Sequence, residues 1–297
     1  MSVRQAGGNP SNKVAATLAM PGTDECLLAL GQLRPVISMA EIRLDLMDSF
    51  DLERLVSDSP CPLIITCRPA REGGRFGGGE SERLDVLKRA MDLGCDYVDI
   101  EWDSVDALLK LKSGKTRLIA SRHWYDRMPA SLLGEYAKLR DRVDVVKLVG
   151  MANRPAEMFP AFELLRHADG PVIAIAMGEA GRLTRILAPC FESCFVTYAA
   201  PSAEYVSAPG QLTVSEMVEV FNLNAAGTHT AVHIHLCSGP DPAGAAGEID
   251  SYGGSGDALR VRLVVTADES RDIAERLRAS IPGLVLTADA AISAEAF

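Results

Sequence analysis

Short apolar runs rich in β-branched residues alternate with longer segments of helical period along most of the chain. The apolar runs predict eight strands: Val14–Ala19, Val36–Leu44, Leu63–Cys67, Tyr97–Ile100, Arg117–Ser121, Val143–Val149, Val172–Ala176 and Cys194–Tyr198. Helical segments follow them, near residues 23–33, 51–57, 80–93, 103–111, 130–140, 155–167, 180–190 and 213–223. This alternation predicts parallel strands, because each crossover helix returns the chain to the same edge of the sheet.

The number of these units selects the architecture. Eight strand–helix units whose strands are apolar on both faces are typical of an α/β fold of the (β/α)8 TIM barrel type. One strand fewer or more would instead favour an open doubly wound sheet. In such a barrel, catalytic side chains gather at the carboxyl ends of the strands.

The same pattern predicts how the chain divides. Residues 1–12 are polar and predicted to be disordered, and residues 13–223 hold the barrel. Residues 224–297 contain two glycine-rich segments, GPDPAGAAG and SYGGSGDA, which are typical of turns. These residues also contain a predicted strand, strand, helix and strand, at Ala231–Leu236, Arg260–Val265, 269–280 and Leu284–Thr287. We therefore expect a small C-terminal α/β extension.

Composition and charge narrow the function classes. The chain has 30 Lys and Arg against 40 Asp and Glu, a formal net charge of −10, which argues against nucleic-acid and anionic-membrane binding. No apolar run approaches the roughly 18 residues of a membrane helix, and the polar opening segment does not resemble a secretory signal. The seven cysteines are scattered and form no CxxC pair, as expected of reduced thiols. We therefore expect a cytoplasmic protein.

Unusual polar residues fall at the predicted carboxyl ends of the strands. Glu41, Arg43 and Asp45 alternate with apolar residues at the end of the second strand, so their side chains point the same way. The others are Arg68 and Glu72 after the third strand, His123 two residues beyond the fifth, Lys147 within the sixth, Arg185 in the helix after the seventh, and Ser207 and Gln211 after the eighth. This edge is where a barrel enzyme carries its chemistry.

Lys147 lies in the apolar run VDVVKLVG, where a charged lysine is costly unless it is paired or neutral. Burial favours the neutral amine, which attacks carbonyl groups to form a Schiff base. His123 on the neighbouring strand could move protons beside such an imine, and Glu72 could orient its ring. The plainer interpretations are a lysine that reaches solvent, a loop histidine bonded to backbone, and a solvated carboxylate.

Three arginines near strand ends, Arg43, Arg68 and Arg185, suggest a small anionic, polyhydroxylated substrate, because a guanidinium holds a carboxylate bidentately. Each could instead close an internal ion pair, for example with Asp45 or Glu101. The glycine-rich segment GGRFGGGES lacks the GK[ST] ending of a phosphate-binding P-loop, so no such loop is predicted.

Seven motifs occur in order at these strand ends: EIRLD at 41–45, TCRPAREGG at 66–74, DYVDIE at 96–101, SRH at 121–123, VVKLV at 145–149, MGEAGRLTR at 177–185 and SAPGQ at 207–211. Together they resemble type I 3-dehydroquinate dehydratase, the Schiff-base lyase of the shikimate pathway of aromatic amino acid biosynthesis. The resemblance covers residues 13–223, roughly three quarters of the chain. It implies conversion of 3-dehydroquinate to 3-dehydroshikimate and water, without a metal or an organic cofactor, by a family that is often dimeric.

The resemblance also implies roles for individual residues. Lys147 would form the imine with the C3 ketone, and His123 would remove a C2 proton, protonate the departing C1 hydroxyl and help to hydrolyse the imine. Glu72 would hold His123. The substrate-binding residues would be Arg185 on the carboxylate, Ser207 and Gln211 on a mobile loop that closes over it, and Glu41, Arg43 and Arg68 on ring hydroxyls, with Thr17 where the family usually has a serine.

Two positions depart from the family pattern. Trp124 and Tyr125 follow the histidine where the family usually has Asp-Phe, and Cys67 replaces a common aromatic residue. Neither change removes a catalytic group, so the sequence predicts an active enzyme. Two other hypotheses remain open. One is a class I aldolase-like barrel, which would usually bind phosphate after strands seven and eight. The other is a pseudoenzyme that binds a pathway ligand or a protein.

The C-terminal extension faintly resembles the start of shikimate dehydrogenase, which plants fuse to the dehydratase, particularly in ALRVRLVVTADESRDIAERLRASIPGLVLT. The Ser-x-Ser motif, the catalytic lysine and the Gly-rich nucleotide loop of that enzyme are absent, so we expect a degenerate remnant without dehydrogenase activity. His233 and His235 project to one side of a predicted strand. With only the loop residue His229 as a further candidate ligand, the sequence predicts no metal site.

Overall fold

The computed structural model describes residues 12–111, 114–223, 226–238, 249–250, 258–281 and 283–289. The first eight strands are β1 (Val14–Leu18), β2 (Met39–Arg43), β3 (Leu63–Thr66), β4 (Tyr97–Glu101), β5 (Arg117–Trp124), β6 (Val145–Met151), β7 (Val172–Met177) and β8 (Thr197–Ala199). The helices between them are α1 (Thr23–Leu33), α2 (Leu52–Asp58), α3 (Glu80–Asp92), α4 (Val105–Leu111), α5 (Leu133–Leu139), α6 (Phe159–His167) and α7 (Arg182–Leu187). A π-helical segment, Glu216–Val220, follows β8.

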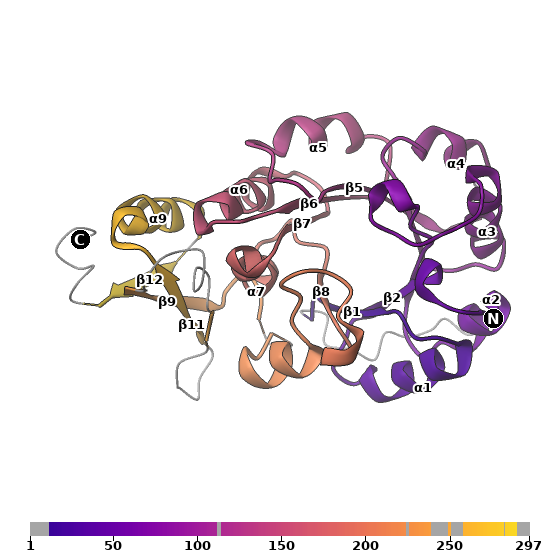
Figure 1. Ribbon diagram of the computed structural model, residues 1–297, viewed down its shortest axis with the longest axis horizontal. Coiled ribbons are helices and arrows are strands. Elements are labelled where there is room, and N and C mark those ends of the chain that lie inside the picture. Colours follow the sequence, from indigo (N-terminus) through magenta and orange to yellow (C-terminus); the bar gives the residue numbers. More distant parts are fainter. Residues whose placement is uncertain are drawn as a thin grey trace.

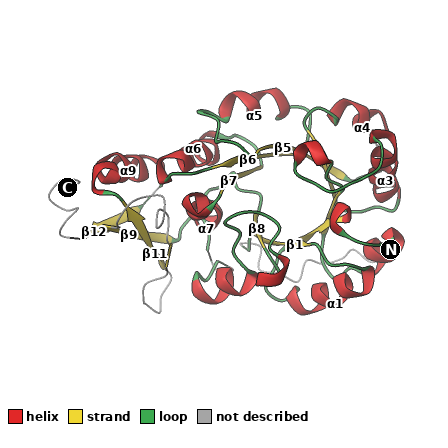
Figure 2. Ribbon diagram, in the orientation of Figure 1, coloured by secondary structure: helices red, strands yellow, loops and turns green. Residues whose placement is uncertain are grey.

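These strands form one parallel sheet in the order β7-β6-β5-β4-β3-β2-β1-β8, with the helices around it (Figures 1 and 2). The remaining gap lies between β7 and β8. Val172 closes it near the start of β7, where its N–H donates to Ser193 O and its carbonyl accepts from Phe195 N, both at 2.8 Å. The predicted (β/α)8 TIM barrel is therefore confirmed as a nearly closed barrel.

Alternation along each strand separates two apolar layers. Leu118 and Ala120 of β5 face outward into the core between the strands and the helices. Ile119 and Val145 face inward and belong to a second cluster in the barrel interior. Because side chains alternate, Lys147 shares the inner face of β6 with Val145.

Strand bounds differ from the prediction at the two strands that matter most for the site. β5 extends to Trp124 because it stays paired with β6, with His123 opposite Val149. His123 therefore lies within the strand, and the prediction that it follows the strand was wrong. β2 ends at Arg43, and Asp45 lies in a short 3-10 turn, Leu44–Leu46.

The C-terminal unit is a four-stranded sheet with one helix. Its elements are β9 (Ala231–Ser238), β10 (Ile249–Asp250), β11 (Ala258–Val265), α9 (Ala267–Ser280) and β12 (Leu284–Ala288), with strand order β10-β11-β9-β12. Helix α9 packs beside α6 of the barrel (Figure 1), where the Arg276 guanidinium lies 4.0 Å from the centroid of the Phe159 ring. The predicted small α/β extension is confirmed. The predicted disorder of residues 1–12 and the glycine-rich turns at 239–247 and 251–258 fall outside the described residues, apart from Asn12 and Ala258. Both predictions were wrong there, because Asn12 is buried and donates to the Val36 carbonyl at 3.0 Å, and Ala258 begins β11.

Candidate active site

A pocket at the carboxyl ends of the barrel strands collects most of the predicted site. Nine of the predicted residues line it: Thr17, Glu41, Arg43, Arg68, His123, Lys147, Arg185, Ser207 and Gln211. Strand register explains the meeting of the lysine and the histidine. Lys147 is level with Ser121 on β5, and His123 lies two residues further along the same inner face. Their side chains therefore enter one pocket, as an imine site requires.

Two carboxylates hold the Lys147 amine. Its Nζ donates to Glu41 Oε1 and to Asp99 Oδ2, each at 2.9 Å, and lies 4.4 Å from the centroid of the Tyr198 ring. Lys147 is buried, so these two contacts pair the amine inside the barrel, and its long side chain does not reach solvent. Asp99 was not among the site residues predicted from the sequence. A signal was present, because Asp99 and Glu101 alternate in the buried strand β4 and so share one face.

Arg68 extends the buried ion-pair network. Its guanidinium lies 2.9 Å from Asp99 and 2.6 Å from Glu101, and it donates to Ser121 Oγ at 2.7 Å. Burial alone would raise the pKa of Asp99, but Arg68 and Lys147 outweigh that effect and hold the pKa well below its usual value. Asp99 is therefore an anion at neutral pH.

Arg43 is held by Asp45 in a bidentate pair, with Nε–Oδ1 and NH2–Oδ2 distances of 2.9 and 2.8 Å. The same carboxylate accepts the backbone N–H groups of Arg68 and Arg75, each at 3.1 Å. Asp45 thus ties β2 to the loop after β3. Arg43 and Arg68 both line the pocket, but each also forms the internal ion pair that the sequence left open.

Glu72 contacts His123 but, unlike His123, does not line the pocket. Its Oε2 accepts the backbone N–H of His123 at 2.8 Å and lies 3.1 Å from the ring Nδ1. Burial, followed by the positive charges of Arg68 and Lys147, lowers the pKa of His123 well below 6.5, so the ring is neutral at neutral pH. A neutral ring that donates from Nδ1 to Glu72 leaves the Nε2 lone pair to accept a proton.

The loop after β3 places Glu72 by close backbone packing. Gly73 has φ of +74°, and a Cβ there would lie 2.3 Å from the Tyr125 ring. A Cβ on Gly74 would lie 2.0 Å from the carbonyl oxygen of Arg68. Tyr125, at one of the positions that depart from the family pattern, donates its hydroxyl to the Glu72 carbonyl at 3.0 Å. The REGG segment therefore needs both glycines to bring Glu72 under His123.

Arg185 differs from the other two arginines. It is buried, no carboxylate among the described residues contacts it, and its Nε has no hydrogen-bond partner there. Burial, with a smaller effect of Arg182, lowers the pKa of Arg185 to about 10, so it remains a cation at neutral pH. A buried, unpaired cation that lines a pocket is suited to hold an anionic group of a ligand.

The loop after β8 completes the pocket wall. Gln211 Oε1 accepts from the backbone N and the hydroxyl of Ser207, at 2.9 and 3.0 Å, and Gln211 Nε2 donates to Thr17 Oγ1 at 3.4 Å. These polar atoms border the same pocket as Arg185. The loop therefore supplies neutral hydrogen-bonding groups beside the unpaired cation.

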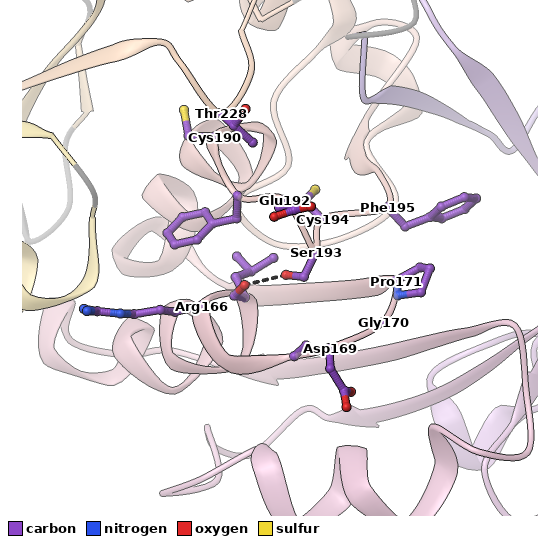
Figure 3. Close-up of a pocket in the computed structure, with 13 residues that line it drawn as sticks. Arg166, Asp169, Gly170, Pro171, Cys190, Glu192, Ser193, Cys194, Phe195 and Thr228 are labelled. Carbon is purple, nitrogen blue, oxygen red and sulfur yellow. Dashed lines mark hydrogen bonds between the residues drawn. The ribbon is translucent and has the colours of Figure 1, made fainter.

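A wider pocket lies elsewhere, at the amino end of β7 (Figure 3). Gly170 and Pro171 precede β7 there, and Ser193 bonds the carbonyl of Leu165. Of its three charged residues, Arg166 and Asp169 point away from each other, and Glu192 lies in the loop before β8 (Figure 3). The strand-end pocket, and not this one, is lined by the predicted catalytic residues Lys147 and His123.

The chain is similar to type I 3-dehydroquinases. A family model described as type I 3-dehydroquinase matches residues 14–228. A 3-dehydroquinate dehydratase of Desulfotalea psychrophila is 33% identical over 222 residues, which are 71% of this chain and 97% of that protein. A chloroplastic bifunctional 3-dehydroquinate dehydratase/shikimate dehydrogenase of Arabidopsis thaliana is 35% identical over 206 residues, which are 66% of this chain but only 34% of the plant protein.

The C-terminal unit also takes part in a structural likeness. The structure of dehydroquinate dehydratase and shikimate dehydrogenase from S. pombe aligns with a TM-score of 0.58 and 23% identity. The alignment covers 93% of this chain and 57% of that one, so it extends past the barrel into the C-terminal unit. At this identity the likeness concerns the fold alone.

Proposed function

Because the chain belongs to the type I 3-dehydroquinase family, we propose that it dehydrates 3-dehydroquinate to 3-dehydroshikimate through an imine on Lys147. The observation that carries this proposal is the entry of Lys147 and His123 into one pocket, with Nζ held 2.9 Å from both Glu41 and Asp99. The family acts in the shikimate pathway of aromatic amino acid biosynthesis.

The first step joins Lys147 to the substrate. Nζ in its neutral form attacks the C3 ketone, the carbinolamine loses water, and a protonated imine remains. The imine carries the positive charge that the ammonium had before, so Glu41 and Asp99 stabilise it at the same place. Their negative charges therefore serve both the resting lysine and the intermediate.

The second step removes the elements of water. His123 Nε2 accepts a proton from C2, and the electron pair of the broken C–H bond moves into the protonated imine to give an enamine. The C1 hydroxyl then leaves with the proton that His123 carries, and the enamine electrons form the C1–C2 double bond. Glu72 stabilises the imidazolium that exists between these two transfers. Hydrolysis of the imine releases the product and restores Lys147.

Arg185 is proposed to bind the substrate carboxylate, because it is the pocket arginine that no described carboxylate contacts. Ser207, Gln211 and Thr17 offer hydrogen bonds beside it, and Glu41, Arg43 and Arg68 border the space for the ring hydroxyls. The class I aldolase-like hypothesis is not favoured, because the family match identifies a dehydratase barrel.

Borohydride trapping tests the proposal. The enzyme is incubated with 3-dehydroquinate and borohydride, and intact mass and peptide mapping locate the reduced adduct. We expect one adduct, on the peptide that holds Lys147, and none in Lys147→Ala. Lys138→Ala is the matched control, because this lysine is two-thirds exposed on α5 and should not change the adduct. A rise in enone absorbance measures product formation in parallel.

Two results would overturn the mechanism. An adduct that persists in Lys147→Ala would move the imine to another lysine. Binding of 3-dehydroquinate without an adduct or enone product would identify a ligand-binding pseudoenzyme.

Location, oligomeric state and further binding partners make up the wider setting of the protein. Among the described residues, no helix is long and apolar enough to cross a membrane. A cytoplasmic location and a homodimer stay predictions, and light scattering after size exclusion tests the second. Nucleic-acid binding remains disfavoured by the net charge of −10. We propose that the C-terminal unit carries no dehydrogenase activity, which an assay with shikimate and a nicotinamide cofactor checks.

A further inference from the structure

Three side chains that ligate transition metals meet at one end of the C-terminal sheet. One ligand atom from each of His235, Cys237 and Asp289 lies within 4.8 Å of the other two. His235 and Cys237 are two residues apart on β9 and so share a face. Asp289 directly follows β12, where its N–H donates to the carbonyl of Leu236 at 3.0 Å. Strand pairing, and not sequence spacing, brings the third ligand into place.

The cluster lies on the face of β9 opposite its apolar side. Ile234 and Leu236 are fully buried on the apolar side of the strand. Cys237 is 4% exposed, whereas the side chains of His235 and Asp289 are 26% and 47% exposed. An ion could therefore enter from solvent on the carboxylate side and reach a sulfur that is shielded from bulk water.

Hydrogen bonds already orient the histidine for ligation. Its Nδ1 lies 2.9 Å from Thr287 Oγ1, and its Nε2 lies 3.0 Å from Asp289 Oδ1. When Nδ1–H donates to the threonine hydroxyl, Nε2 presents a lone pair toward the carboxylate. In this tautomer the Nε2 lone pair and Asp289 Oδ1, 3.0 Å apart, are placed to bind one ion together. Metal-bound histidines usually have an outer partner of this kind on the second ring nitrogen.

The arrangement does not fit a Cys-His-Asp nucleophile. In a catalytic triad the histidine stands between the other two groups, with one ring nitrogen toward each. Here Thr287 and Asp289 engage both ring nitrogens of His235, so neither is directed to the sulfur. The sulfur and the carboxylate both lie within 4.8 Å of the histidine ligand atom and of each other, which is the convergence that ligation of one ion requires.

We propose that His235, Cys237 and Asp289 bind one divalent transition-metal ion of the Zn²⁺ type. Thiolate, imidazole and carboxylate are the usual ligands of Zn²⁺, and water takes the fourth position when three come from protein. One thiolate and one carboxylate neutralise the ion, so the nearby Arg262 faces a centre without net charge. Arg262 Nε donates to Cys237 Sγ at 3.4 Å, a contact that a thiolate accepts better than a thiol does.

The site would join the edge of the sheet to its middle. β12 is an edge strand, and β9 lies between β12 and β11. A metal bound to Cys237 and Asp289 would therefore fasten the end of β12 to β9 and stabilise the C-terminal unit. It would take no part in the dehydratase reaction, because its ligands lie outside the barrel pocket. The inference is thus independent of the proposed function.

Zinc titration tests the site. The untagged full chain is stripped with a chelator, and Zn²⁺ uptake is measured by calorimetry and by elemental analysis after dialysis. We expect one Zn²⁺ per chain, and a weakening of more than about 100-fold in Cys237→Ser and His235→Gln, because loss of an outer partner alone costs 10–100-fold. His233→Gln is the matched control, since it lies on the same face of β9 but outside the ligand cluster.

Two further measurements keep the test decisive. Asp289→Asn changes a half-exposed side chain at a strand end, so it reports on ligation even if a substitution on β9 disturbs folding, which circular dichroism would reveal. Co²⁺ in place of Zn²⁺ should give a thiolate charge-transfer band that Cys237→Ser loses and His233→Gln keeps. The proposal is overturned if the wild-type chain takes up no stoichiometric Zn²⁺, or if uptake survives in Cys237→Ser and Asp289→Asn.

Discussion

The Glu72 carboxylate holds His123 at two points, since Oε2 accepts the backbone N–H at 2.8 Å and lies 3.1 Å from the ring Nδ1. One oxygen therefore sets both the main-chain position and the ring orientation of the residue. The pair is not an ion pair at neutral pH, because burial and nearby cations keep His123 neutral. Burial also raises the pKa of Glu72 from 4.5 to about 7. The proton balance of this pair is thus sensitive near neutrality.

Glu72→Gln should lower the activity of the enzyme but raise its stability above neutral pH. We expect kcat to fall by about 10²- to 10⁴-fold, because the amide stabilises neither the reactive tautomer nor the imidazolium. A folded-state pKa above the unfolded value means that the stabilising contribution is complete below pH 4.5 and is lost as pH rises through about 7. The permanently neutral glutamine escapes that loss, so the variant should be more stable than wild type at pH 8, by up to about 3 kcal/mol.

Urea denaturation of both proteins at pH 4, 6 and 8 measures this effect. The advantage of Glu72→Gln should grow across the series and be absent at pH 4. An advantage that is constant with pH would contradict the raised pKa of Glu72.

Asp99→Asn should destabilise the fold and remove one of the two carboxylates that hold Lys147. Asp99 is fully buried between Arg68 and Lys147, and its removal leaves two buried cations short of a partner. We expect a loss of about 3–5 kcal/mol at pH 7. Because the pKa of Asp99 is lowered in the fold, its contribution is present above its unfolded value of 3.8 and is lost as pH falls through the folded value. The difference between the variant and wild type should therefore be the same at pH 5 and pH 7 and should shrink as pH falls below 3.8.

Asp58→Asn serves as the control for this prediction, since Asp58 is half exposed and pairs weakly with Arg54. Its free energy of unfolding should stay within about 0.5 kcal/mol of wild type. Chemical denaturation at pH 3, 5 and 7 compares the proteins. An Asp99→Asn variant as stable as Asp58→Asn would mean that the buried network contributes nothing to stability.

Arg185→Met should weaken substrate binding without lowering the stability of the fold. The substitution removes a buried cation that no described carboxylate contacts, so the melting temperature should rise or stay the same. The apparent KM for 3-dehydroquinate should rise by roughly 30- to 1000-fold, the effect of about 2–4 kcal/mol of lost charge pairing. Steady-state kinetics and a thermal melt measure both. A lower melting temperature with an unchanged KM would assign Arg185 a structural role instead.

Gly74→Ala should disturb the loop that carries Glu72. The new Cβ would lie 2.0 Å from the backbone oxygen of Arg68, so the loop must shift. We expect at least about 2 kcal/mol of destabilisation and a kcat loss that resembles that of Glu72→Gln. Gly77→Ala in the same loop meets no atom within 4 Å and should behave as wild type. If Gly77→Ala lost as much stability and kcat as Gly74→Ala, the close contact with the Arg68 oxygen would not be the cause of the effect.

Much of the fold was predictable because its signals are local. Alternating apolar strands and helical periods depend on neighbouring residues, and they located all eight barrel strands, the C-terminal helix and three strands of the C-terminal sheet, but not the short strand β10. Lys147 was recognised as a candidate for a similar reason. A lysine within an apolar strand is visible from its immediate neighbours in the sequence, without knowledge of its partners. The ordered motifs then pointed to the family that the comparisons support. These features belong to single segments of the chain.

Partners across the barrel were decided only by the tertiary structure. Asp99 contacts Lys147 from 48 residues away, and Glu41 from 106 residues away, because barrel closure turns inward-facing residues of distant strands toward one axis. Pairing of β9 with β12 brought Asp289 to His235 in the same manner. Sequence alone determined which residues are unusual and which element each occupies. Strand register and barrel curvature determined which of them touch, since electrostatic and hydrogen-bonding forces act over a few ångströms in space, whatever the separation along the chain.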